Sequence, residues 1–292
     1  MPTLRVRDDL GRDVVVSRPP RRIVSLVPSD TFSLFALGCG DRVVGRTRYC
    51  TEPAAAAAIP EVGGTKDVDV DAVLALEPDL VIANQEENTR VALEALATRT
   101  KILVSMPRRL ADGLAHLARL ARVLGVEREP AVRALIRRGH ALGAAPSPAP
   151  HATAFIPIWM EPLMTCNADT FGSDVLARLG IANAFGDRLR IYPLAADLGK
   201  QAAADAAGRD TRYPRITTDE LVARAPTMII LPDEPHAFSA ADRAALAALA
   251  TPAATSGRII DVSGKDLFWS GAWSLDALPR LAAQLAAPLA GA

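Results

Sequence analysis

Hydrophobic positions in the first hundred residues alternate between short β-branched runs and longer runs with helical spacing. Continuous apolar residues predict buried strands at RRIVSLV (21–27), RVVG (42–45), DLVIA (79–83) and KILVS (101–105). Apolar residues at a spacing of three to four positions predict amphipathic helices at 30–37, 71–77 and 87–98. Asp30 and Asp71 stand where helix N-caps are expected. This alternation favours parallel α/β layers.

The middle of the chain is rich in helix-forming residues and ends in a stretch typical of a linker. Helical spacing continues through 111–125 and 129–143, and GAAPSPAP (143–150) follows. Strand and helix patterns then resume with HATAFIPIW (151–159), DTFGSDVLARLG (169–180), TTDELVARAP (217–226) and TMIILP (227–232). We therefore predict an N-terminal α/β lobe of residues 1–126, a connecting backbone helix and linker of residues 127–149, and a C-terminal α/β lobe of residues 150–292.

The second half of the chain repeats the first. VDAVLALEPDLVI and TDELVARAPTMII superpose without a gap at an offset of 148 residues, which pairs Asp71 with Asp219. The tripeptide Asp-Thr-Phe at 30–32 and again at 169–171 opens a predicted helix that ends in Leu-Gly. Two similar lobes joined by a long helix would hold a ligand in the cleft between them, beyond the carboxyl ends of the strands.

Composition narrows the classes of partner. The 33 Lys and Arg balance the 33 Asp and Glu, so the basic excess of a nucleic-acid-binding protein is missing. No apolar run approaches the roughly 20 residues of a membrane span. Acidic and basic residues at 8–13 occupy the place of a secretory apolar stretch, so we expect no export signal in this chain.

Signatures of catalysis or metal binding are weak. The cysteines Cys39, Cys50 and Cys166 lack CxxC spacing and predict buried free thiols, with one disulfide left open. Gly38-Cys39-Gly40 is better explained as a helix C-cap than as a dinucleotide loop. The four histidines have no metal-ligand spacing and are predicted to be solvated or supporting. We assign no catalytic residue and no metal site.

Aromatic residues are scarce, at 4%, so their positions are informative. Six of the 13 lie mostly in predicted loops at strand ends, where they would suit a bulky planar or macrocyclic ligand: Tyr49, Trp159, Tyr213, Phe268, Trp269 and Trp273. For Trp273 we favour core packing. For Phe268 and Trp269, core packing and ligand contact stay equally open.

Four ordered segments resemble one family. They are the stretch from DDLGRD to RTRYC (8–50), IPEVGGTKDVDVDAVLALEPDLVIANQEEN (59–88), RYPRITTDELVARAP (212–226) and GKDLFWSG (264–271). Together they resemble the class III substrate-binding proteins of ABC importers for iron–siderophores, haem and vitamin B12, with the cobalamin-binding protein and the helical backbone metal receptor group as the nearest likenesses. The resemblance implies an α/β fold of two Rossmann-like lobes, joined by a long rigid helix, with the ligand cleft between them.

The resemblance also implies roles for individual positions. Tyr49 matches a ligand-contacting tyrosine, and a second contact segment matches Asp266, Leu267, Phe268, Trp269 and Ser270. Thr65 and Asn84 stand where the cobalamin pocket has two tryptophans, and Tyr213 replaces a third. Asn84, Glu87 and Asp266 are expected to supply polar contacts, and Trp159 aromatic contact. Two glutamates that dock onto the permease correspond to Asp71 and Asp219. The stretch 188–210 is longer than in the cobalamin protein and is expected to add a flap at the cleft rim.

The sequence thus predicts a non-enzymatic, monomeric protein that binds a metal chelate, either a corrinoid such as cobalamin or a ferric siderophore. It would deliver this ligand to an ABC importer permease and hold no intrinsic cofactor. The family resemblance implies a periplasmic or extracytoplasmic location. Two alternatives are kept: a cytoplasmic corrinoid or metal-chelate carrier or sensor, and an enzyme that acts on a chelate in the cleft.

Overall fold

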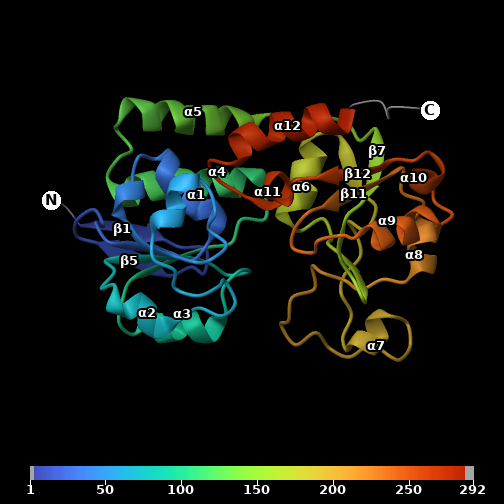
Figure 1. Cartoon of the computed structure of the whole chain (residues 1–292), viewed down its shortest axis with the longest axis horizontal. Coiled ribbons are helices and arrows are strands. Elements are labelled where there is room, and N and C mark those ends of the chain that lie inside the picture. The colour runs from blue at the N-terminus through green and yellow to red at the C-terminus, as the bar shows by residue number, and fades with distance from the viewer. Residues whose placement is uncertain (1–2, 287–292) are drawn as a thin grey trace. The chain divides into compact units, whose positions relative to one another are not determined.

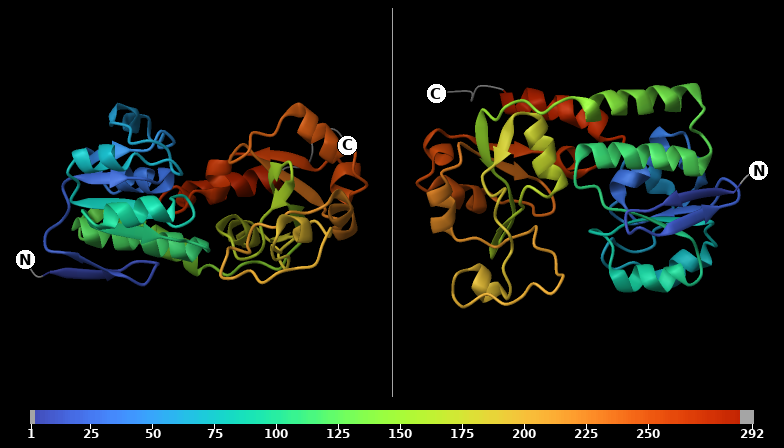
Figure 2. Two further views of the ribbon diagram at one scale, coloured as in Figure 1. Left: turned by 90° about the horizontal axis from the view of Figure 1, so that it is seen from below. Right: turned by 180° about the vertical axis from the view of Figure 1, so that it is seen from behind.

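The computed structural model describes residues 3–286, which fold into two α/β units (Figures 1 and 2). Unit 1 comprises residues 3–144 and 269–275, and unit 2 comprises residues 145–268 and 276–286. The first boundary falls at the start of the stretch predicted to be a linker. This boundary divides the predicted connecting segment 127–149, because residues 127–144 belong to unit 1 and residues 145–149 to unit 2.

Unit 1 contains a four-stranded parallel sheet in the order β4-β3-β5-β6. Its strands are β3 (Ile23–Ser25), β4 (Val43–Arg46), β5 (Leu80–Asn84) and β6 (Ile102–Ser105). The helices are α1 (Pro28–Ala36), α2 (Val70–Ala75), α3 (Arg90–Ala97), α4 (Leu110–Leu124) and α5 (Pro130–Ala144), with short 3-10 turns η1 (Gly40–Arg42) and η2 (Ala54–Ala58). Helix α5 packs against α4 and belongs to unit 1.

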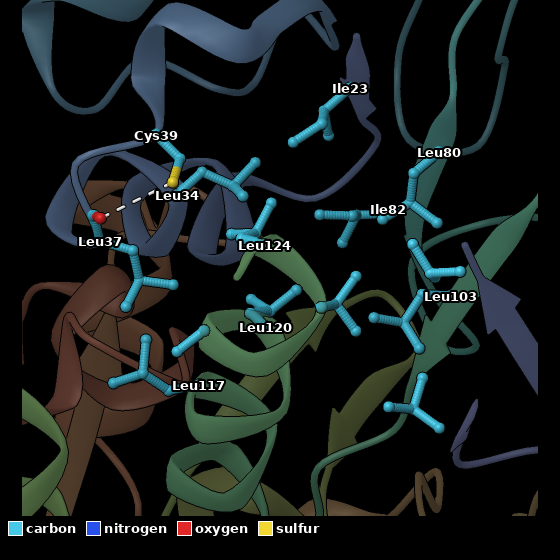
Figure 3. Close-up of a cluster of buried hydrophobic side chains, with 14 of the residues drawn as sticks. Ile23, Leu34, Leu37, Cys39, Leu80, Ile82, Leu103, Leu117, Leu120 and Leu124 are labelled. Carbon is cyan, nitrogen blue, oxygen red and sulfur yellow. Dashed lines mark hydrogen bonds between the residues drawn. The ribbon is translucent and has the colours of Figure 1, made fainter. Parts of the chain in front are cut away.

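The two faces of this sheet are covered by different helices, because successive strand side chains point to opposite faces. Ile23, Ile82 and Leu103 pack with leucines of α1 and α4 (Figure 3). Val24 and Val81, the neighbours of Ile23 and Ile82 in sequence, pack with residues of α2 and α3 on the opposite face. Strands buried on both faces explain the continuous apolar runs in the sequence.

Unit 2 repeats this architecture. Its parallel sheet has the order β10-β7-β11-β12, formed by β7 (Ala152–Phe155), β10 (Ile181–Asn183), β11 (Met228–Pro232) and β12 (Ile259–Val262). An antiparallel hairpin of β8 (Pro157–Met160) and β9 (Leu163–Thr165) follows β7. The helices are α6 (Phe171–Arg178), α7 (Leu194–Asp197), α8 (Thr218–Arg224), α9 (Ala240–Ala247), α10 (Pro252–Thr255) and α11 (Gly264–Phe268). Helix α12 (Ser274–Ala286) begins in unit 1 and continues in unit 2.

The internal repeat is confirmed at the level of backbone conformation. Strand order is the same in both sheets, and the offset of 148 residues that aligns the sequences also places β5 on β11. Glu77 and Ala225, which this offset pairs, both have positive φ, at 45° and 47°. Both residues directly precede a proline, which cannot continue the helix before it. Equivalent elements therefore end in the same way in the two units.

The helix caps differ from the sequence prediction. Helix α2 is capped by Asp69, whose side chain accepts a backbone N–H of the first turn at 2.9 Å. Helix α8 is capped in the same way by Thr217, at 3.1 Å. Asp71 and Asp219 each lie two residues further on, in the first turn of their helix, and both are exposed. The expectation that Asp71 caps α2 is therefore wrong.

Helix α1 also begins earlier than expected. It starts at Pro28, so Asp30 is not its cap but a buried residue of the first turn. The Asp30 carboxylate lies 3.3 Å from Nε2 of His116 on α4, and both side chains are buried. His116 is thus a buried partner of Asp30 rather than a solvated histidine. Gly38 follows α1 with φ of 72°, which confirms that it ends the helix.

A hairpin absent from the sequence prediction precedes the first parallel sheet. Strands β1 (Leu4–Arg7) and β2 (Asp13–Val16) pair antiparallel, and Val6, Val14 and Val16 join the core of unit 1. The three cysteines are free and buried, as predicted. None of the helices within residues 3–286 has the length and apolar character needed to cross a membrane.

Candidate functional site

Polar and aromatic side chains gather where the strands of unit 1 end. Tyr49 follows β4 and is 53% exposed. Beside it, Arg48 donates two hydrogen bonds to the carboxylate of Asp67, at 3.0 and 2.8 Å, and lies 5.6 Å from the Tyr49 ring centroid. Hydrogen bonds to Asp67 and then to Tyr49 raise the pKa of Arg48, and the same ion pair lowers the pKa of Asp67. The guanidinium beside the Tyr49 ring is therefore already paired with the Asp67 carboxylate.

Asn84, the last residue of β5, shapes the loop that follows it. Its Oδ1 accepts the backbone N–H groups of Glu86 and Glu87, at 2.7 and 3.2 Å. Asn88 closes the turn by accepting the N–H of Asn84 at 2.9 Å and donating to the carbonyl of Thr65 at 3.0 Å. Asn84 and Thr65 are both buried. Both residues therefore hold this loop in place through their hydrogen bonds and do not extend toward solvent.

Glu86 and Glu87 form the outer part of the same loop, together with Lys66. Lys66 donates a hydrogen bond to the carbonyl of Glu86. Although the Glu87 residue is exposed, desolvation by the surrounding protein raises the pKa of its carboxyl, and the charge of Lys66 partly opposes this. A hydrogen bond with Thr65 also stabilises the charged form of Glu87. The loop therefore presents both an ammonium and a carboxylate.

Unit 2 presents an aromatic group on the β8–β9 hairpin and the loop after β11. Trp159 is 45% exposed, and its Nε1 donates to the carbonyl of Glu161 at 3.1 Å. The ring of His236 lies 4.9 Å from Trp159 and 4.8 Å from Phe238, measured between centroids. Nε2 of His236 lies 3.6 Å from the Asp242 carboxylate. Sequence reasoning placed Trp159 in the site but missed His236 and Phe238, which are brought to it from a segment about 77 residues away.

Tyr213 is half-buried in the segment that precedes α8. The guanidinium of Arg212 lies 5.4 Å from the centre of its ring and is itself bonded to Asp210, at 2.9 and 2.6 Å. This segment runs beside β9, because Thr165 donates its N–H to the carbonyl of Pro214 at 3.1 Å. Tyr213 is therefore a neighbour of the hairpin that bears Trp159.

The segment 266–270 is more deeply packed than a ligand-contact segment would need to be. The Asp266 carboxylate accepts two hydrogen bonds from Arg280, at 2.8 and 2.6 Å. Leu267 is buried, and the half-buried Phe268 lies directly against Gly172 of α6. Trp269, in unit 1, is 6% exposed and lies 5.2 Å from the ring of Trp273. Ser270 is buried as well. Of these residues, Phe268 is the most open to solvent.

Metal binding by protein side chains alone finds no support in the described part of the chain. It contains no group of three or more His, Cys, Asp or Glu that could hold a metal ion.

Comparison with known proteins identifies the family. Residues 23–262 match the family described as periplasmic binding protein. The chain belongs to this family. Its members are binding proteins, so the chain is a non-enzymatic binding protein, as the sequence predicts.

Curated relatives align with this chain over different lengths. The vitamin B12-binding protein of Pectobacterium carotovorum subsp. carotovorum (strain PC1) is 23% identical over 241 residues, which cover 81% of this chain and 80% of that protein. The uncharacterized ABC transporter substrate-binding lipoprotein YvrC of Bacillus subtilis (strain 168) is 41% identical over 80 residues, 27% of this chain and 25% of YvrC. The vitamin B12-binding protein of Yersinia pestis (strain Pestoides F) is 28% identical, and the match spans 62% of its length.

Solved structures share the fold. The periplasmic vitamin B12 binding protein BtuF of Vibrio cholerae superposes with a TM-score of 0.71 at 22% identity, covering 91% of this chain and 97% of that one. The periplasmic heme-binding protein RhuT from Roseiflexus sp. RS-1 gives a TM-score of 0.70 at 21% identity, with the same coverage. The predicted fold class, α/β with two parallel sheets, is thereby confirmed.

Proposed function

We propose that this protein binds a metal chelate and delivers it to an ABC importer. The chelate would be a corrinoid such as cobalamin, a haem or a ferric siderophore. Support comes from the family, from the named vitamin B12-binding and heme-binding proteins and from the substrate-binding lipoprotein YvrC. We further propose that the protein works outside the cytoplasm, because its family is that of periplasmic binding proteins and RhuT, which shares its fold, is periplasmic.

One observation favours a large, flat ligand. Tyr49 and Trp159, one in each unit, are 53% and 45% exposed, whereas the other described Phe, Trp and Tyr side chains are buried or half-buried. In a chain with 4% aromatic residues, an exposed ring after β4 and another on the β8–β9 hairpin support contact with a ligand. Aromatic rings offer wide apolar contact with only two torsions to fix, which suits a macrocycle.

Other candidate residues divide by exposure. We propose that Glu87, Tyr213 and Phe268 contact the ligand with Tyr49 and Trp159. The buried residues of the sequence prediction would instead hold these groups in place through their hydrogen bonds and packing: Thr65, Asn84, Asp266, Leu267, Trp269 and Ser270. We also propose that Asp71 and Asp219 dock onto cationic residues of the permease.

The test is a titration of the purified protein, followed by tryptophan fluorescence. Hydroxocobalamin, haem and a ferric hydroxamate siderophore are the probes. Exposed Trp159 should be quenched by a coloured chelate that binds beside it, whereas Trp269 and Trp273 supply a buried background. Saturable quenching by one probe is expected, and Trp159→Phe should remove most of the change.

Side-chain truncation then tests the two rings. Tyr49→Ala and Trp159→Ala should each weaken binding about tenfold, the scale of one aromatic contact. Val91→Ala is the matched control, because Val91 is an apolar side chain on α3 with 78% exposure and should leave affinity unchanged. Absence of binding across all three probes would refute the proposed function.

A further inference from the structure

Two arginines of unit 2, Arg190 and Arg215, lack a carboxylate partner. Both are half-buried, and the Nε atom of each is buried without a hydrogen-bond acceptor. Within residues 3–286, no acid lies within ion-pair distance of either guanidinium. Arg215 donates from Nη1 to the carbonyl of Tyr213 at 3.2 Å, and the Arg190 guanidinium lies 4.4 Å from the centre of the Tyr192 ring. Neither guanidinium therefore has the direct carboxylate partner expected of a partly buried cation, although the charge of Asp197 acts on Arg215.

Neighbouring arginines in the same segments are paired. Arg188 donates to Asp197 at 3.0 Å and to Glu220 at 3.0 Å. Arg212 is held by Asp210, as described above. These local acids are thus paired with other arginines, whereas Arg190 and Arg215 form no direct ion pair.

The backbone on both sides of this pair is fixed by one buried acid. Asp197, the last residue of α7, accepts the N–H of Ile191 on Oδ1 at 2.9 Å and the N–H of Arg215 on Oδ2 at 2.7 Å. The N–H of Arg190 donates to the carbonyl of Thr211 at 2.7 Å, which ties the same two segments together. These segments lie around α7 in Figure 1. The two guanidinium groups are therefore borne by a preorganised backbone.

The two positive charges also act on each other. Burial, and next the charge of Arg190, lower the pKa of Arg215, while the negative charge of Asp197 acts in the opposite direction without cancelling this effect. Like charges held close in a partly desolvated site oppose folding, and a bound anion would relieve this repulsion.

We propose that Arg190 and Arg215 together bind a carboxylate group of the transported chelate. Planar guanidinium groups with several N–H donors match the geometry of a carboxylate. The inference rests on the proposed function and narrows it: a chelate with free carboxylates, such as haem with its propionates or a ferric polycarboxylate, is favoured over cobalamin, whose corrin side chains are amides.

The test compares a ligand with and without its carboxylates. Wild-type protein should bind haem at least tenfold more tightly than haem dimethyl ester, in which both propionates are neutral. Arg190→Met and Arg215→Met should each weaken haem binding about tenfold, the scale of one charge-assisted hydrogen bond, and leave ester binding unchanged. Arg209→Met is the matched control. Arg209 also lies over Tyr192, at 3.9 Å, but it donates to the carbonyls of Ala206 and Asp205 and is exposed.

A second measurement keeps this proposal separate from the transport function. Citrate, compared with chloride at equal ionic strength, should raise the melting temperature of the wild type but not of the double variant Arg190→Met/Arg215→Met. In chloride the double variant should melt at a higher temperature than the wild type, because the repulsion is gone. Equal stabilisation of both proteins by citrate, equal binding of haem and its ester, or binding of hydroxocobalamin alone would overturn the proposal. Stabilisation by inorganic phosphate alone would show a site for a free anion and would also overturn it.

Discussion

At the scale of single residues, several aspartates of this chain serve as acceptors for backbone amides in loops. Asp8 accepts the N–H groups of Leu10 and Arg12, at 3.0 and 2.8 Å. Asp79 and Asp197 each accept two backbone N–H groups in the same way. Loop amides need such partners because no neighbouring strand or helix turn supplies them. Acids used in this way are unavailable to a ligand, which is why few of the 33 Asp and Glu are candidates for the site.

Asp79 allows a test of this role through pH. Its carboxylate accepts the N–H of Arg21 at 2.9 Å and of Arg22 at 3.1 Å, which ties the start of β3 to the start of β5. The hydrogen bond from the N–H of Arg21 is the largest influence on the pKa of Asp79, and it lowers this pKa. Partial burial acts in the opposite direction, but the net effect is a pKa below 3.8. The charged carboxylate therefore stabilises the fold at pH values above 3.8, and this contribution is lost as pH falls through the lowered pKa.

Asp79→Ala should accordingly lower the free energy of unfolding by about 1 kcal/mol at pH 7, since the side chain is partly exposed. The difference from the wild type should shrink as pH falls below 4, which urea unfolding at a series of pH values would show. Asp13→Ala is the control. It removes an exposed ion pair with Arg5 and should change stability by less than about 0.5 kcal/mol. A pH-independent loss at Asp79 would contradict the electrostatic explanation.

At the scale of elements, the repeated helix–strand unit begins and ends its helix in the same way in both units. Asp69 and Thr217 cap the helices, and Glu77 and Ala225 take the left-handed conformation that ends them. Residues with a Cβ adopt this conformation at a cost, because Cβ approaches the following carbonyl oxygen. Neither position is a glycine, so each unit retains a strained residue at the same place.

Ala225→Gly should therefore stabilise the protein. Relief of the left-handed strain outweighs the added entropy of the unfolded chain, for a net gain of about 0.5 kcal/mol in the free energy of unfolding. Ala223→Gly is the matched control, since Ala223 is an exposed residue of the same helix and glycine there should cost about 1 kcal/mol. Opposite signs in urea unfolding are expected. Destabilisation by both substitutions would show that Ala225 is not strained.

The sequence predicts those elements whose signal is local. β-branched runs predict β3, β5, β6 and β11, and the fixed offset predicts the repeat. The β1–β2 hairpin was missed although Leu4 and Val6 alternate with arginines, because the exposed Val15 between Val14 and Val16 hides the alternation in the second strand. Contacts between distant residues have no local signal. The pairing of Asp266 with Arg280, and of Asp30 with His116, therefore emerged only from the fold.

The same limit applies to the candidate site. Sequence and resemblance selected Tyr49 and Trp159, and both are exposed, but Trp159 lies within strand β8 and not in the predicted loop after a strand. They did not separate these rings from Trp269, because burial depends on which segments pack over a residue. His236 was visible in the sequence but lacked metal-ligand spacing, and its approach to Trp159 depends on the loop after β11.

At the scale of the whole molecule, the repeat gives each unit one exposed aspartate at an equivalent place. Asp71 and Asp219 lie in the first turn of α2 and α8, and neither caps its helix. The caps are Asp69 and Thr217, so loss of charge at Asp71 or Asp219 removes no capping hydrogen bond. This separation of roles allows docking to be tested without unfolding the helices.

Asp71→Asn and Asp219→Asn should each reduce the stimulation of importer ATPase activity, and the double variant should reduce it more than tenfold. The physical reason is the loss of a carboxylate that would pair with a permease cation, an interaction of roughly 1.5 kcal/mol or more when desolvated. The measurement is ATP hydrolysis by the importer in proteoliposomes, with saturating ligand-loaded binding protein.

Ligand affinity and unfolding free energy should stay within about 0.5 kcal/mol of the wild type, because side-chain charge near a helix N-terminus contributes little more. Asp41→Asn, a change at another exposed aspartate of unit 1, is the control and should stimulate normally. Full stimulation by the double variant would refute docking through these two residues and move the permease contact to another surface of the units.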